Sequence, residues 1–213
     1  MTQEAYHLIE RDLNAQHARN EARRIRTRVH EARRNPHPAG FRWPFELLQN
    51  ALDSGPRDGN SIEVWIRCEA SRLIFEHTGA PFTSVELAAL LSGGSSKEFE
   101  SEVTTGRFGA GFLVTHALAD RTTLRGLLKV ARGYERFEMV LDRSGSEEDI
   151  LRNTQSCNDA IRLAAPVQDY KNIPSASVAL ATQHRPSNST ELLAWKSSAS
   201  SDTYGFRTKF GKC

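Results

Sequence analysis

The segment Thr105-Gly106-Arg107-Phe108-Gly109-Ala110-Gly111-Phe112 carries three glycines within six residues and precedes an apolar run that ends at Ala119. We expect a glycine-rich turn that opens a helix. Such a turn leaves backbone N–H groups free at the positive end of the helix dipole, where phosphate groups bind. Because similar turns also occur without any ligand, the segment indicates a function only together with a second motif.

The second motif lies upstream, in Glu46-Leu47-Leu48-Gln49-Asn50-Ala51-Leu52-Asp53. We expect a helix that begins near Trp43-Pro44-Phe45 and ends at Ser54-Gly55-Pro56, because Pro favours helix starts and Gly favours helix ends. The polar positions share one face of this helix, at i, i+4 and i+7: Glu46, Asn50 and Asp53. The apolar positions are expected to face the core: Leu47, Leu48, Ala51 and Leu52.

The polar stripe offers two kinds of chemistry. Glu46 could polarise a water molecule as a general base. Asn50 offers an amide oxygen, a ligand suited to Mg²⁺, which usually keeps several of its waters. The alternative is that the stripe is only the solvated face of an amphipathic helix.

Together the two motifs resemble those of the Bergerat-fold ATPases, the superfamily of DNA gyrase, the large heat-shock chaperone, histidine kinases and mismatch-repair ATPases. The signature E-x-x-x-N-A-x-D is matched by Glu46, Asn50, Ala51 and Asp53. The signature G-x-F-G-x-G-F is matched by Gly106, Phe108, Gly109, Gly111 and Phe112. Between them, residues 91–99 resemble the nucleotide lid of the chaperone and place Lys97 where it could reach a phosphate. The resemblance covers residues 41–125 and is closest to the chaperone-like ATP-binding domain.

The resemblance implies an α+β two-layer sandwich, with a mixed, mostly antiparallel sheet covered on one face by helices. It implies ATP binding with slow Mg²⁺-dependent hydrolysis that drives lid closure or dimerisation of a larger protein. Glu46 would then be the general base, and Asn50 would hold the Mg²⁺. The glycines and Phe108 and Phe112 would bring the backbone close to the phosphates, while Asp53, His77 and Gly79 would border the base and the sugar.

The chain departs from the family in the box that reads D-x-G-x-G at the end of a strand. Gly79 matches the first glycine, but His77 stands in place of the Asp and Pro81 in place of the second glycine. In the family this Asp accepts the adenine amino group. A neutral imidazole can accept the same hydrogen bond, but only as the right tautomer. The alternative is a turn histidine without a ligand role.

The N-terminal region is basic and helical in pattern, with a helix expected over residues 4–32. Its arginines crowd one stretch: Arg19, Arg23, Arg24, Arg26, Arg28, Arg33 and Arg34. Such a helix could bind nucleic acid electrostatically, although no aromatic residues alternate with the arginines to support base stacking. The alternative is a solvated helix that packs on the domain or on a dimer partner. The resemblance implies an arm used in a homodimer.

Strands are expected over residues 61–68, 71–76, 122–129, 134–141 and 174–181, and apolar residues alternate clearly in the first and fourth of these. Helices are expected over residues 84–91 and 147–163, and order is doubtful in the serine-rich tail. We therefore divide the chain into a basic helical arm (1–38), an ATP-binding domain (39–186) and a tail (187–213). Superfamily members usually join this domain to a transducer region, so we expect the chain to be a fragment or a truncated product.

Composition sets outer limits. The 213 residues include 38% apolar residues, three cysteines and a net charge of +2. No apolar run approaches the ~20 residues of a membrane span, and no secretory signal is visible, so we expect a cytoplasmic location. The spacing of the cysteines suggests neither a disulfide framework nor a metal site. A nucleotide-gated binding module that does not hydrolyse ATP remains the main alternative function.

Overall fold

The computed structural model describes residues 2–34, 36–57, 59, 61–69, 71–94, 111–181 and 206–210, with the backbone alone in 36–41 and 206–210. Within these ranges seven strands form one sheet, in the order β5-β4-β3-β6-β2-β1-β7. Their bounds are Ile62–Glu69 (β1), Arg72–His77 (β2), Arg121–Val130 (β3), Gly133–Asp142 (β4), Ala165–Val167 (β5), Ala176–Ala181 (β6) and Phe206–Phe210 (β7). All neighbouring strands are antiparallel except β1 and β7, which are parallel.

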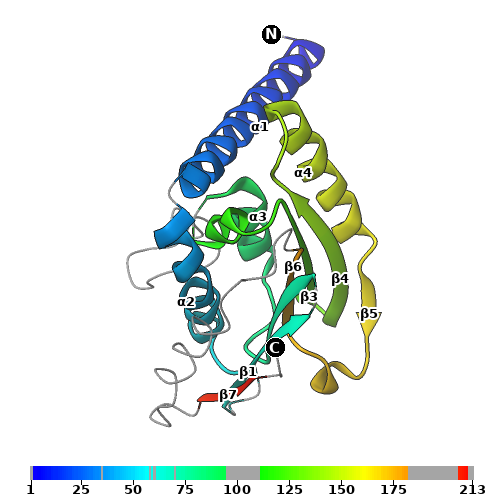
Figure 1. The fold of residues 1–213 in the computed structure, drawn as a ribbon. Coiled ribbons are helices and arrows are strands. Elements are labelled where there is room, and N and C mark those ends of the chain that lie inside the picture. The colour runs from blue at the N-terminus through cyan, green and yellow to red at the C-terminus, as the bar shows by residue number, and fades with distance from the viewer. Residues whose placement is uncertain are drawn as a thin grey trace.

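Helices gather on one side of this curved sheet, where the start of α4 packs against α1 and the two helices then diverge (Figure 1). Their bounds are Gln3–Arg34 (α1), Pro36–Ser54 (α2), Ser84–Ser92 (α3) and Glu147–Arg162 (α4), with short 3-10 helices at Phe112–Ala117 (η2) and Tyr170–Asn172 (η3). Helix α3 begins with a complete capping box. The Thr83 side chain accepts the Glu86 N–H, and the Glu86 side chain accepts the Thr83 N–H.

The two faces of the sheet differ in polarity, because neighbouring rows of registered residues point to opposite faces. One row of registered side chains crosses five strands on the helix-covered face and is buried throughout: Ile66, Phe75, Val178, Leu124 and Met139. The next row points to the other face and is largely polar: Trp65, Glu76, Ser177, Arg125 and Glu138. Residues of α2, α3, η2 and α4 belong to the same hydrophobic cluster as the first row. The helices therefore complete one core against one face.

This architecture confirms the predicted α+β class and the mostly antiparallel sheet. The expected strands and helices outside α2 are confirmed within a few residues, including the capped helix after Thr83. Helix α1 is also confirmed, but its C-terminal half is part of the domain. Ala22, Ile25 and Val29 are buried and pack with Leu113 and Ile150.

Helix α2 begins earlier than expected, at Pro36 rather than near Trp43. A proline at the first helical position loses nothing, because that N–H has no partner within a helix. Pro44 then lies inside the helix, where it cannot donate to a carbonyl one turn earlier. Trp43 and Leu47, exposed by only 4% and 2%, pack on the core on either side of Pro44 and hold the helix across this gap.

Three further expectations need correction. Leu52 is 43% exposed and does not face the core, although Leu47 and Ala51 do. The apolar run after Gly111 forms a 3-10 helix of six residues, so a strong helix dipole is absent from this described segment. In the tail, Phe206–Phe210 pair with β1 as a strand that the sequence did not predict. Finally, none of the helices in the described ranges combines the length and the hydrophobicity that a membrane span requires.

Candidate functional site

Helix α2 carries the polar stripe, and packing fixes how that stripe is turned. Leu47 and Ala51 are almost completely buried, at 2% and 0% exposure. Their position leaves Glu46 at the edge of the core, with 25% of its side chain exposed, and draws Asn50 inward to 4% exposure. The Asn50 Nδ2 has no hydrogen-bond partner among the described residues. A buried amide without a partner is unusual and is typical of a site that a ligand or water completes.

The end of the glycine segment lies directly against this stripe. A Cβ built on Gly111 would stand 2.3 Å from Glu46 Oε2, closer than any real contact. Gly111 has ordinary helical backbone angles, so an added Cβ would not strain the backbone but would displace the end of the Glu46 side chain. The structure thus joins the two sequence motifs at Glu46 and Gly111. Four other residues of the predicted site lie outside the described residues: Lys97, Gly106, Phe108 and Gly109.

Glu46 also has a cationic partner that the sequence analysis missed. The Arg42 Nη2 donates to Glu46 Oε1 over 2.8 Å. The pair spans one helical turn, at i and i+4 of a helix that begins earlier than the sequence predicted. Each oxygen of the Glu46 carboxylate therefore faces a different neighbour, Arg42 on one side and Gly111 on the other.

The second glycine of interest docks on the C-terminal turn of α2. A Cβ on Gly79 would stand 2.1 Å from Ser54 Oγ and 3.1 Å from the Ala51 carbonyl oxygen. The following residue, Ala80, donates its N–H to the Gly55 carbonyl over 2.8 Å. The end of β2 is therefore held against the same helix that carries Glu46, Asn50 and Asp53. Asp53 itself accepts a hydrogen bond from Gln49 over 2.8 Å.

His77 lies at the end of β2 with 3% of its surface exposed. Burial, reinforced by the positive charge of Arg57, lowers the pKa of His77 to about 4, so the imidazole is neutral at pH 7. Its Nδ1 accepts the N–H of Gly79 over 3.0 Å. In a neutral imidazole the proton must then be on Nε2, which makes Nε2 a donor. Acceptance of an amino group, as weighed from the sequence, would need the other tautomer.

Phe112 belongs to the core and not to the rim of the site. It is 1% exposed and meets His116 edge to face, with ring centroids 6.3 Å apart. Its burial anchors the residue next to Gly111, and this anchoring helps to hold Gly111 against Glu46.

Asn50 is the residue that the sequence predicts as a metal ligand. Among the residues that the structure describes, no group of three or more His, Cys, Asp or Glu side chains could hold a metal ion. Asn50 offers a single amide group. One protein ligand of this kind suits Mg²⁺ that is held mainly by phosphate oxygens and waters.

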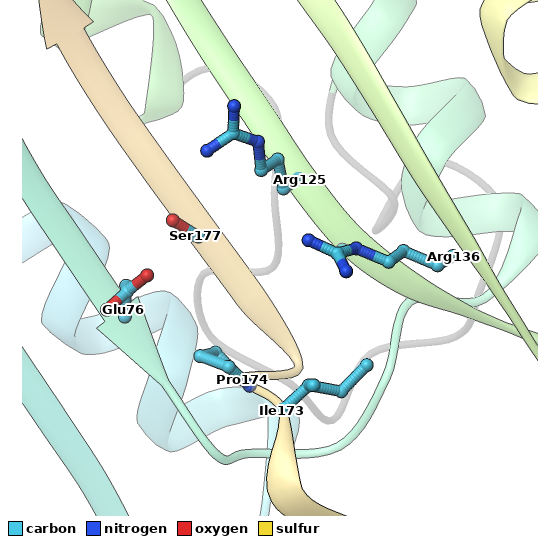
Figure 2. A pocket seen from close by; sticks show the side chains of 7 residues that line it. Glu76, Arg125, Arg136, Ile173, Pro174 and Ser177 are labelled. Atoms are coloured by element: carbon cyan, nitrogen blue, oxygen red, sulfur yellow. The ribbon is translucent and has the colours of Figure 1, made fainter. Parts of the chain in front are cut away.

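A separate hollow of about 110 Å³ lies on the other face of the sheet (Figure 2). Its lining includes Glu76, Arg125, Arg136 and Ser177, which project from β2, β3, β4 and β6. Arg125 is held by both carboxylate oxygens of Glu138, and Glu76 is paired with Arg67. The hollow shares no residue with the candidate site on α2.

No protein-family model matches this chain, and no curated protein matches its sequence.

Proposed function

We propose that the chain is an ATP-binding domain of the Bergerat type, which hydrolyses the nucleotide slowly with Mg²⁺. One observation carries the proposal: two glycines that are far apart in sequence both press against helix α2. Gly111 meets the Glu46 carboxylate near the middle of the helix, and Gly79 meets the Ala51 carbonyl and Ser54 at its end. A nucleotide bound along this helix would have its phosphates at the first contact and its base at the second.

The roles follow the chemistry of the residues. Glu46 is partly exposed and would orient or deprotonate the attacking water. Asn50 would offer its amide oxygen to Mg²⁺, whose charge would offset that of the phosphates when bound. The backbone N–H groups of Gly106, Gly109 and Gly111 would meet the phosphates without help from a strong helix dipole. His77 and Gly79 would border the base, beside Asp53.

The arginines of α1 give little support to nucleic-acid binding as the function. Arg23 and Arg26 pair with Glu147 on α4. Arg28 donates to the Gly93 carbonyl, and Arg33 donates to the His116 carbonyl and pairs with Asp120. These contacts dock the helix on its own domain.

The test separates binding from turnover. We expect calorimetry to detect a non-hydrolysable ATP analogue, with tighter binding when Mg²⁺ is present. We expect Glu46→Gln to keep this binding and to lose about 100-fold or more in phosphate release, the usual contribution of a general base. Glu148→Gln, on the exposed surface of α4, is the matched control and should leave turnover unchanged.

Two outcomes would change the conclusion. Absence of binding to the analogue, with or without Mg²⁺, would refute the proposed function. Background phosphate release by both the wild type and Glu46→Gln, with binding intact, would identify a nucleotide-gated binding module instead of an ATPase.

A further inference from the structure

We propose that Arg42 is a ligand of the terminal phosphate, held by Glu46 until a triphosphate replaces that carboxylate. The inference rests on the proposed function, because it names a further residue of the same nucleotide site. It starts from the ion pair between Arg42 and Glu46 and from the contact of Glu46 with Gly111.

The Glu46 carboxylate lies between Arg42 and Gly111, the end of the glycine segment. The Arg42 Nη2 lies 2.8 Å from Glu46 Oε1, and the other oxygen of the same carboxylate is the atom that a Cβ on Gly111 would meet at 2.3 Å. Any phosphate held by backbone N–H groups at this end of the glycine segment would therefore lie close to Glu46. The guanidinium binds the other oxygen of the same carboxylate, and we infer that a rotation of the Arg42 side chain brings it to such a phosphate.

The ion pair is built so that it can exchange partners. The Arg42 side chain is 66% exposed, and the pair joins residues one turn apart on a helix. Exposed pairs of this kind contribute little to stability, so breaking one costs little. A terminal phosphate carries more charge than a carboxylate, and a guanidinium binds it through two parallel N–H bonds. A triphosphate is thus the stronger partner for Arg42.

Exchange of partners would have two consequences. The site would distinguish a triphosphate from a diphosphate, because only the triphosphate offers the terminal group. It would also release Glu46 from its ion pair only when ATP is bound, so that the carboxylate can face water.

The experiment compares affinities for a non-hydrolysable ATP analogue and for ADP, both with Mg²⁺, by calorimetry on the full chain. We expect Arg42→Ala to weaken binding of the analogue by about 10-fold or more and binding of ADP by less than about 2-fold, the loss of one charge-assisted contact. Arg42→Lys keeps the charge but loses the two parallel N–H bonds, so it should keep part of the preference for triphosphate. Arg121→Ala removes an equally exposed arginine that pairs with Asp142 and should change neither affinity.

The outcomes separate the two proposals. Loss of the preference in Arg42→Ala, with partial retention in Arg42→Lys and full retention in Arg121→Ala, supports the inference. A wild type without a preference for triphosphate, or an unchanged preference in Arg42→Ala, overturns it while ATP binding stands. Equal weakening of both nucleotides also overturns it, since that result indicates only a support of the helix. A wild type that binds neither nucleotide overturns the proposed function as well.

Discussion

At the scale of single residues, the hydrogen bond from the Gly79 N–H to His77 Nδ1 determines which kind of hydrogen bond His77 can form with a bound base. The neutral imidazole carries its proton on Nε2, so His77 would donate to a ring nitrogen or a keto oxygen and would not accept from an amine. We predict that the triphosphate of purine riboside, which lacks the exocyclic amine, binds within about 2-fold of ATP, below the effect of one lost hydrogen bond.

Substitutions at the same position give the reciprocal result. His77→Asp places an acceptor there, so this variant should prefer ATP to the purine riboside triphosphate by about 10-fold, the worth of one charge-assisted bond. His77→Ala should weaken both nucleotides alike. Competition calorimetry measures the wild type and both variants. A 10-fold loss for the purine riboside analogue with the wild-type protein would mean that the amine is recognised, and the donor role of His77 would be wrong.

The sequence could predict some of these residues and not others. Glu46, Asn50 and Asp53 were visible because helical spacing alone places them on one face. The tautomer of His77 was not, because it depends on a backbone N–H two residues away whose direction is set by the docking of Gly79 on α2. The partner of Glu46 was overlooked because Arg42 lies before Pro44, where the sequence predicted no helix and hence no i to i+4 pair.

At the scale of secondary-structure elements, α1 serves as part of the core over its C-terminal half. Ile25 is 1% exposed, and its Cγ1 lies 2.6 Å from where a Cβ on Gly93 would be, so it packs directly on the residue that caps α3. Arg28, one turn later, donates to the Gly93 carbonyl over 2.6 Å. The helix thus fixes the chain where α3 ends.

We predict that Ile25→Ala lowers the free energy of unfolding by about 2–4 kcal/mol, because it opens a cavity between α1, α3 and η2. Ile9→Ala makes the same chemical change on the same helix, but Ile9 is 49% exposed and the loss should stay below about 0.5 kcal/mol. Urea denaturation of the two variants measures the difference. Equal losses would show that the interface around Ile25 does not contribute as the packing indicates.

Element prediction succeeded where the pattern is local and failed where distant contacts decide. The alternation in β1 and β4 reflects one buried and one open face, so it can be read from the sequence. The start of α2 could not be read, because two prolines and a glycine in this region argue against a helix that tertiary packing of Trp43 and Leu47 nevertheless supports. Strand β7 was missed because its partner among the described strands is β1, more than 100 residues earlier in the chain.

At the scale of the whole molecule, the core contains two neutral histidines that link stability to pH. Burial lowers the pKa of His77 to about 4 and that of His116 to about 3. The nearby positive charges act in the same direction, from Arg57 on His77 and from Arg143 and Arg33 on His116. In the unfolded chain both groups titrate near pH 6.5, so between pH 6.5 and 4 the unfolded state binds more protons.

Stability from these histidines is therefore complete above pH 6.5 and is lost as the pH falls toward 4 and then 3. Each should lower the free energy of unfolding by up to about 1.4 kcal/mol per pH unit in this window. We predict that His116→Gln flattens the dependence measured by urea denaturation at pH 7, 6 and 5 by roughly this slope. His30→Gln, at an exposed position on α1, should leave the slope of the wild type unchanged. An unchanged slope in His116→Gln would mean that His116 is already protonated in the folded protein, which would require a partner for its Nε2 that the described core does not provide.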